Sequence, residues 1–342
     1  MTLILDKLQQ HSSNFGNTKK GWNKSFTICT NYLNSISPNA YAWKDPEANN
    51  IYFVGLTAGL SLKIFGAWST ICSLTRVAGH LDSGHSNYPH PYSTDIIDKF
   101  LISDLLDEWY INPNDSYSRL LSHSLWMISI EWIYWHEVAH IIHGHTGRRL
   151  HRKKGRVIIP EFTNSDRTNS LFEDQLMEID ADEAATWWCL DGWVNDTSPL
   201  SPLLSINDID TFSYLLFYSI CILQHFFGNM KPDIHNIDGD IGYPDGTVRI
   251  DSSFSMIVNY YLNSGNTIDT NVENISNKLM LAMGDARSSL KVVAPGRDLF
   301  SGLYDRKVEH KPITAVRSLY RKKINEYARD LWRPHRLNPE PV

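Results

Sequence analysis

The chain has 342 residues, of which 42% are hydrophobic and 12% aromatic, so it can bury a sizeable core and is not a largely disordered protein. Its formal net charge of −6 argues against binding of nucleic acid by the surface as a whole, although local basic patches remain compatible with such binding. The four cysteines, at positions 29, 72, 189 and 221, show no paired spacing, which argues against a thiolate zinc site or a disulfide framework and favours a reducing, cytoplasmic location.

The N-terminal part of the chain is expected to form helices around one short hairpin. Residues 1–38 are interpreted as a helical lead-in, and the apolar stretch at their start is too short for a signal peptide. Residues 39–60 predict the hairpin, and helices are predicted over residues 61–76 and 94–110. Later in the chain, residues 211–228 predict a buried core helix, since no segment reaches the ~20 apolar residues that a membrane span needs.

Residues 115–144 predict a long helix that carries the pattern His136-Glu137-Val138-Ala139-His140. Residues four apart lie on one helical face, roughly 6 Å apart along the axis, so the two histidines can bind one metal ion. Glu137 lies beside that face, where its carboxylate can reach a water on the metal without becoming a ligand. The pattern therefore predicts one zinc ion per chain, with Glu137 as the general base.

A catalytic zinc site of this type needs a third protein ligand. His143 shares the face but lies roughly 10 Å of helix rise from the first histidine, and His145 fails the metzincin spacing. The preferred third ligand is Glu178, in a second helix predicted over residues 170–192. Asp182 lies one turn later on the same face, and we expect it to accept a hydrogen bond from a zinc-bound histidine.

Other charges near this site are interpreted as solvated. Asp180 and Glu183 are expected on the outer face of the second metal-bearing helix. Residues 145–169 form a basic insert between the two metal-bearing helices, and its run of Lys and Arg at 148–156 is interpreted as a solvated face. A lid, or a surface that recognises an acidic substrate, is the alternative for that run. A second basic stretch at 305–336 is a candidate docking tail.

The order of these pieces resembles the gluzincin peptidases of the HtpX and CAAX-prenyl-protease type. The resemblance rests on His-Glu-x-x-His followed by Glu-x-x-Ala-Asp at residues 178–182, with weaker matches at residues 39–60 and 243–250. Tyr243 stands where that family usually has His, and the family's multi-span membrane anchor is missing. The phage-exclusion protease Lit, a cytosolic His-Glu-x-x-His enzyme, is a looser resemblance.

The resemblance implies a mainly α fold with a small β-hairpin or sheet (α+β), built on a zincin-like core with two metal-bearing helices. That core would occupy residues 39–260, followed by a helical, basic extension over residues 261–342. The strand at residues 51–54 would be an edge that pairs with an extended substrate.

The resemblance also implies roles for the late segment. Tyr243 or the nearby His235 would donate a hydrogen bond to the oxyanion of the tetrahedral intermediate, and Arg249 would pair with an acidic group at the site. A surface turn at residues 243–246 is the alternative for this segment.

Together these observations predict a selective zinc-dependent endopeptidase that acts on protein or peptide substrates, with no membrane span and no stable nucleic-acid binding. Zinc held by His136, His140 and Glu178 would polarise a water whose proton Glu137 takes and passes to the leaving amine. A non-catalytic, zinc-stabilised interaction protein and a DNA-associated repair protease are the alternatives. The presence of Glu137 favours an enzyme, because a structural zinc site closes with four protein ligands.

Overall fold

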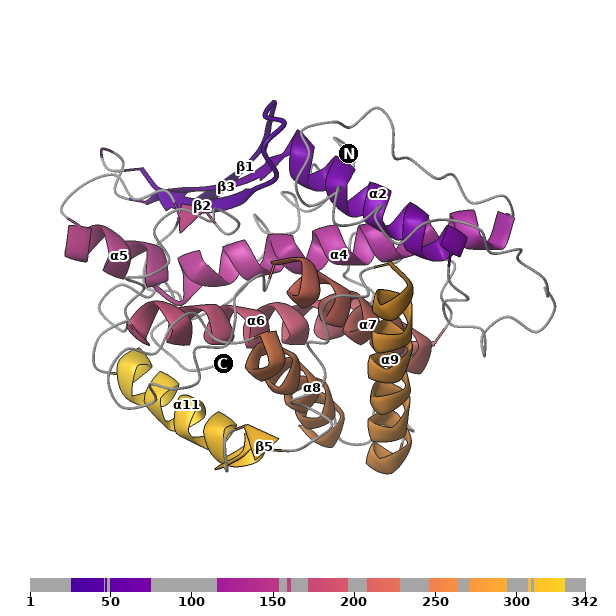
Figure 1. The fold of residues 1–342 in the computed structure, drawn as a ribbon. Coiled ribbons are helices and arrows are strands. Elements are labelled where there is room, and N and C mark those ends of the chain that lie inside the picture. The colour runs from indigo at the N-terminus through magenta and orange to yellow at the C-terminus, as the bar shows by residue number, and fades with distance from the viewer. Residues whose placement is uncertain are drawn as a thin grey trace.

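The computed structural model describes residues 26–45, 47, 50–74, 116–153, 159–160, 172–195, 208–227, 246–263, 271–293, 307–308 and 311–329. Within this part, helices dominate and a small sheet lies against one of them, which confirms the α+β class (Figure 1). The central helix is α4 (Ser116–Ile142), as predicted. The sheet and helix α2 (Ala58–Leu74) cover one side of α4, and α6 (Phe172–Val194) packs against its other side.

The sheet has the strand order β1-β3-β2-β4. Strands β2 (Ala40–Lys44) and β3 (Ile51–Thr57) form the predicted antiparallel hairpin. Strand β1 (Thr27–Leu33) runs parallel to β3, and the two-residue β4 (Ile159–Pro160) pairs with the outer side of β2.

Two expectations about this region are wrong. Residues 27–33 form a strand rather than part of a helical lead-in, because the β-branched residues Thr27, Ile28 and Thr30 favour an extended chain, and Ile28 is buried as the strand's inner face requires. As a result β3 pairs on both sides, so the expectation that residues 51–54 form an open edge for substrate is also incorrect.

Helix α2 begins directly after β3, and this junction fixes how the sheet meets the helices. The Thr57 hydroxyl accepts a hydrogen bond from the Leu60 backbone N–H at 3.2 Å, which caps the first turn of α2. Gly59 is packed against the backbone at Ile36, since a Cβ there would lie 1.9 Å from that carbonyl oxygen. The junction therefore requires glycine because of close backbone approach.

Buried hydrogen bonds hold α4 between its neighbours. The indole of Trp68 on α2 donates to the Ser129 hydroxyl at 2.9 Å. Nearly one turn further along α4, the indole of Trp132 donates to Thr186 of α6 at 3.1 Å. Ala181 is fully buried, as expected for a helix that approaches α4 closely. The position of α6 relative to α4 is thus fixed by close packing and by polar contacts.

Helix α4 ends at Ile142, and Gly144, two residues later, has φ 84° and so adopts the left-handed conformation that commonly follows a helix end. Helix α5 (His145–Lys153) begins at the next residue, within the basic insert, and packs against α4 and β2. The turn at Gly144 therefore directs the start of α5 back toward the end of α4.

The remaining helices pack against α4, α6 and one another (Figure 1). Helix α7 (Ile209–Phe227) is the predicted core helix, and its side chains are almost all buried. Among the described residues, no helix is both long and apolar enough to cross a membrane. The other elements of this part are α8 (Gly246–Asn263), α9 (Val272–Val293), β5 (Lys307–Val308), β6 (Lys311–Pro312) and α11 (Ile313–Tyr327).

Candidate active site

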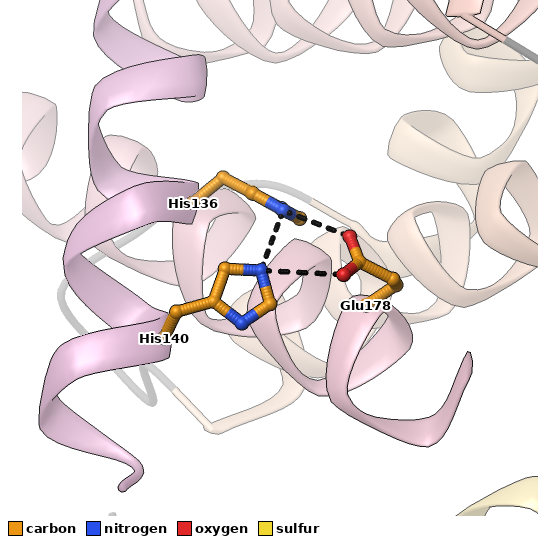
Figure 2. A group of neighbouring side chains, drawn as sticks. All are labelled: His136, His140 and Glu178. Atoms are coloured by element: carbon orange, nitrogen blue, oxygen red, sulfur yellow. Dashed lines mark hydrogen bonds and ion pairs between the residues drawn. The ribbon is translucent and has the colours of Figure 1, made fainter. Parts of the chain in front are cut away.

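His136 and His140 lie on one face of α4, with their Nε2 atoms 3.0 Å apart (Figure 2). The four-residue helical spacing places one imidazole above the other, as the sequence predicts. The two residues are 2% and 0% exposed, so their rings lie within the protein rather than on its surface.

Glu178 reaches the two histidines from α6 (Figure 2). Its Oε2 lies 3.3 Å from the Nε2 of His136, and its Oε1 lies 3.6 Å from the Nε2 of His140. Ligand atoms that surround zinc tetrahedrally at about 2.0–2.1 Å are about 3.3–3.4 Å apart. The three separations found here bracket that value, so the two imidazoles and the carboxylate fit a shared metal ion.

Asp182 lies behind His136, one turn further along α6 than Glu178. Its Oδ1 is 2.9 Å from the Nδ1 of His136, which turns the Nε2 lone pair of the ring toward Glu178. The Asp182 carboxylate also accepts two hydrogen bonds from Arg249 of α8, at 2.5 and 2.7 Å, and one of 3.5 Å from the Gln224 amide. Burial alone would raise the pKa of Asp182, but Arg249 lowers it below its usual value.

Arg149 of α5 also contacts Glu178. Its Nη2 donates to Glu178 Oε1 at 2.9 Å and its Nε donates to Asp174 at 3.0 Å. The preceding Arg148 pairs with Glu173 at 2.9 Å. The interpretation of residues 148–156 as a solvated face is therefore wrong for these two arginines, because acidic side chains of α6 pair with them.

These contacts keep Glu178 ionised. Burial alone would raise the pKa of the Glu178 carboxyl, but His140, His136 and Arg149 together hold it well below its usual range. Burial lowers the pKa of His140, and Glu178 opposes that effect only in part. A neutral imidazole next to an ionised carboxylate is the protonation state that binds a metal cation.

Asp180 and Glu183 are each 7% exposed, which contradicts the expectation that they are solvated. The Oδ2 of Asp180 lies 2.5 Å from the Nδ1 of His143 and 3.2 Å from the Nε2 of His145. Glu183 accepts a hydrogen bond from Ser252 of α8 at 2.5 Å and pairs with an arginine of α11. Both are buried because α6 is covered by α4, α5, α8 and α11 and has no outer face over these turns.

The other predicted catalytic residues are placed only in part. Glu137 follows the first histidine on α4 and is fully buried. Arg249 pairs with Asp182, whose carboxylate also contacts His136, and its role at the site stays a prediction. Tyr243 and His235 lie outside the described residues, and their roles stay predictions.

Sequence reasoning missed three residues that contact this cluster, namely Arg149, Gln224 and His145. His145 was considered only as a metal ligand, yet its Nδ1 lies 2.9 Å from the Nδ1 of His140. The spacing of four between His145 and Arg149 was a usable signal, because it places both on one face of α5. No comparable signal pointed to Gln224, which approaches from the last turns of a separate helix.

Comparison with known proteins gives one family. The family model Peptidase U49 matches residues 91–262, a segment that includes α4, α6, Arg149 and Arg249. Neither the curated proteins nor the solved structures contain a significant match.

Proposed function

The chain belongs to the Peptidase U49 family and is therefore a peptidase, and from that premise we propose that His136, His140 and Glu178 hold a catalytic zinc ion. The observation that carries this proposal is the convergence of two imidazole nitrogens and one carboxylate from two helices, at contacts of 3.0 to 3.6 Å. Two imidazoles and one glutamate form a donor set used by catalytic zinc sites.

The number of ligands favours catalysis over a structural role. Structural zinc is held by four protein ligands, whereas catalytic zinc keeps one position for water or substrate. In the part of the chain that the structure describes, the group at His136 contains three residues that could hold a metal ion. When bound there, zinc supplies a Lewis acid that lowers the pKa of water and polarises a carbonyl.

We assign the proton transfers to Glu137. Its position directly after the first histidine places its backbone about 100° around the helix axis from the ligand stripe. The carboxylate accepts a proton from the water that attacks the scissile carbonyl carbon. It then delivers that proton to the amide nitrogen as the C–N bond breaks, so that the products are a carboxylic acid and an amine.

Asp182 and Arg249 act on His136 rather than on the substrate in this proposal. The Asp182 carboxylate keeps the hydrogen of the imidazole on Nδ1, which leaves Nε2 free to bind the metal. Arg249 holds that carboxylate with two hydrogen bonds and balances its buried charge. Its partner at the site is thus Asp182, and Tyr243 or His235 remains the proposed donor to the oxyanion.

The two alternative functions have less support. Membership of a peptidase family counts against a purely structural zinc protein. A DNA-associated repair protease would use the basic insert for phosphate binding, yet Arg148 and Arg149 are paired with the carboxylates of Glu173, Asp174 and Glu178. Selectivity for few protein substrates stays a prediction from the resemblance to Lit.

The proposal is tested by metal removal on the purified full-length chain, with an unfolded protein such as casein as substrate. Dialysis against a strong chelator should abolish cleavage, and addition of zinc should restore it in wild type but not in His140→Ala. The control is a surface substitution, Asn195→Ala, at an exposed residue at the end of α6. Cleavage that persists after complete metal removal would refute a zinc mechanism.

A further inference from the structure

The two ligand histidines differ in what supports them. His136 has a carboxylate 2.9 Å from its Nδ1, which is the usual arrangement behind a metal-bound imidazole. His140 instead has a second imidazole at that place, because the Nδ1 of His145 lies 2.9 Å from the Nδ1 of His140. His145 is the first residue of α5, immediately after the turn at Gly144, and it is fully buried.

The hydrogens of this pair can be counted. Two ring nitrogens 2.9 Å apart share one hydrogen, so one nitrogen donates and the other accepts. A neutral His140 that binds metal through Nε2 carries its hydrogen on Nδ1. The Nδ1 of His145 must then accept, which places the hydrogen of His145 on its Nε2. That atom lies 3.2 Å from the Oδ2 of Asp180, where an acceptor is required.

We propose that His145, held by Asp180, is a positioning residue that accepts a hydrogen bond from His140 and so fixes the ring that binds the metal. This inference rests on the proposed zinc site. Asp180 is held in turn by His143, whose Nδ1 is 2.5 Å from the same carboxylate oxygen. The Asp182 carboxylate thus orients His136 directly. The Asp180 carboxylate orients His140 through a relay, in which the imidazole of His145 lies between the two.

A second metal ion is the competing explanation for His143, His145 and Asp180, whose potential ligand atoms lie within 4.8 Å of one another. Two observations count against it. The Nδ1 of His143 and the Oδ2 of Asp180 are 2.5 Å apart, which is a hydrogen-bond distance. Two ligand atoms of one tetrahedral zinc ion would be about 3.3 Å apart. Metal on the Nε2 of His145 would also move its hydrogen to Nδ1, where it would meet the hydrogen on the Nδ1 of His140.

Two substitutions at one position separate these explanations. His145→Asn keeps an amide oxygen near the position of Nδ1, whereas His145→Gln keeps an amide group only near the position of Nε2. The relay predicts that zinc affinity, measured by competition with a chromogenic chelator, stays near wild type in His145→Asn. It should fall about 10–100-fold in His145→Gln, the usual effect of losing a group that supports a metal ligand.

The second metal site is tested by His143→Gln, which removes one of its three possible ligands without touching His140. The relay predicts one zinc per chain in wild type and in this variant. Two zinc ions in wild type and one in His143→Gln would overturn the relay in favour of a second metal site. Equal affinities of the Asn and Gln variants of His145 would also overturn it, while one zinc per chain would leave the proposed function intact.

A wild-type protein that binds no zinc would contradict both the relay and the proposed function. If neither variant of His145 folds by circular dichroism, the ring tautomers of the zinc-loaded wild type provide the test. With ¹⁵N-labelled histidine, His145 should carry its hydrogen on Nε2 and His140 on Nδ1. A hydrogen on the Nδ1 of His145 would overturn the relay.

Discussion

The contact between Asp182 and His136 can be tested by replacing the acid with its amide. In Asp182→Asn the side chain keeps its shape but loses its charge, and Arg249 faces a neutral group. An amide oxygen is a weaker acceptor than a carboxylate, so the Nδ1–H of His136 is less well held and its Nε2 becomes a poorer ligand.

The expected loss of zinc affinity is about 10–100-fold, or about 1.4–2.7 kcal/mol at about 1.36 kcal/mol per factor of ten. Chelator competition on the folded variant measures this loss directly. The matched control is Glu183→Gln, the next residue on α6, whose carboxylate contacts Ser252 and Arg321 rather than the histidines. A zinc affinity that is unchanged in Asp182→Asn, or lowered equally in both variants, would refute the assignment of Asp182 as the support of His136.

Three further predictions concern catalysis and the fold. Glu137→Gln should retain zinc while kcat falls by at least ~10²-fold, and unchanged turnover of a protein substrate would exclude Glu137 as the base. Gly59→Ala should lower the free energy of unfolding, measured with urea, by at least about 1–3 kcal/mol, because its Cβ would meet the Ile36 carbonyl. Gly246→Ala should be tolerated, because a Cβ there would lie 3.4 Å from its nearest neighbour. Equal stability of the two would contradict that packing. Tyr243→Phe should lower kcat with little change in KM if its hydroxyl donates to the oxyanion, and a change in KM alone would remove that role.

Local sequence patterns were sufficient to predict helices α2, α4, α6 and α7 and to nominate the three proposed ligands. The spacing within His136-Glu137-Val138-Ala139-His140 acts over one turn of a single helix, and Glu178 follows from the same short-range geometry in a second one. The buried helix α7 was equally predictable from the sequence, because its apolar run extends over the whole element. Features of this kind depend on a few neighbouring residues and do not require knowledge of tertiary contacts.

The errors arose where several elements meet. Strand pairing between β1 and β3 depends on which segments come together, and neither strand alone indicates whether it lies at an edge. Asp180 and Glu183 were assigned to solvent because helical periodicity separates two faces but does not reveal whether other helices cover both. His145 was missed as a support for His140 because that role depends on the turn at Gly144, which brings the start of α5 back toward α4.

The most direct test of a zinc site at the end of α4 is the metal content of the purified protein and two variants, measured by mass spectrometry. The proposed site predicts one zinc per chain in wild type and in Glu137→Gln, and none in His140→Ala. The His140→Ala protein must be folded by circular dichroism for its zinc content to be compared. Zinc retained in full by folded His140→Ala, or lost in Glu137→Gln, would contradict the assignment of the ligand and of the general base.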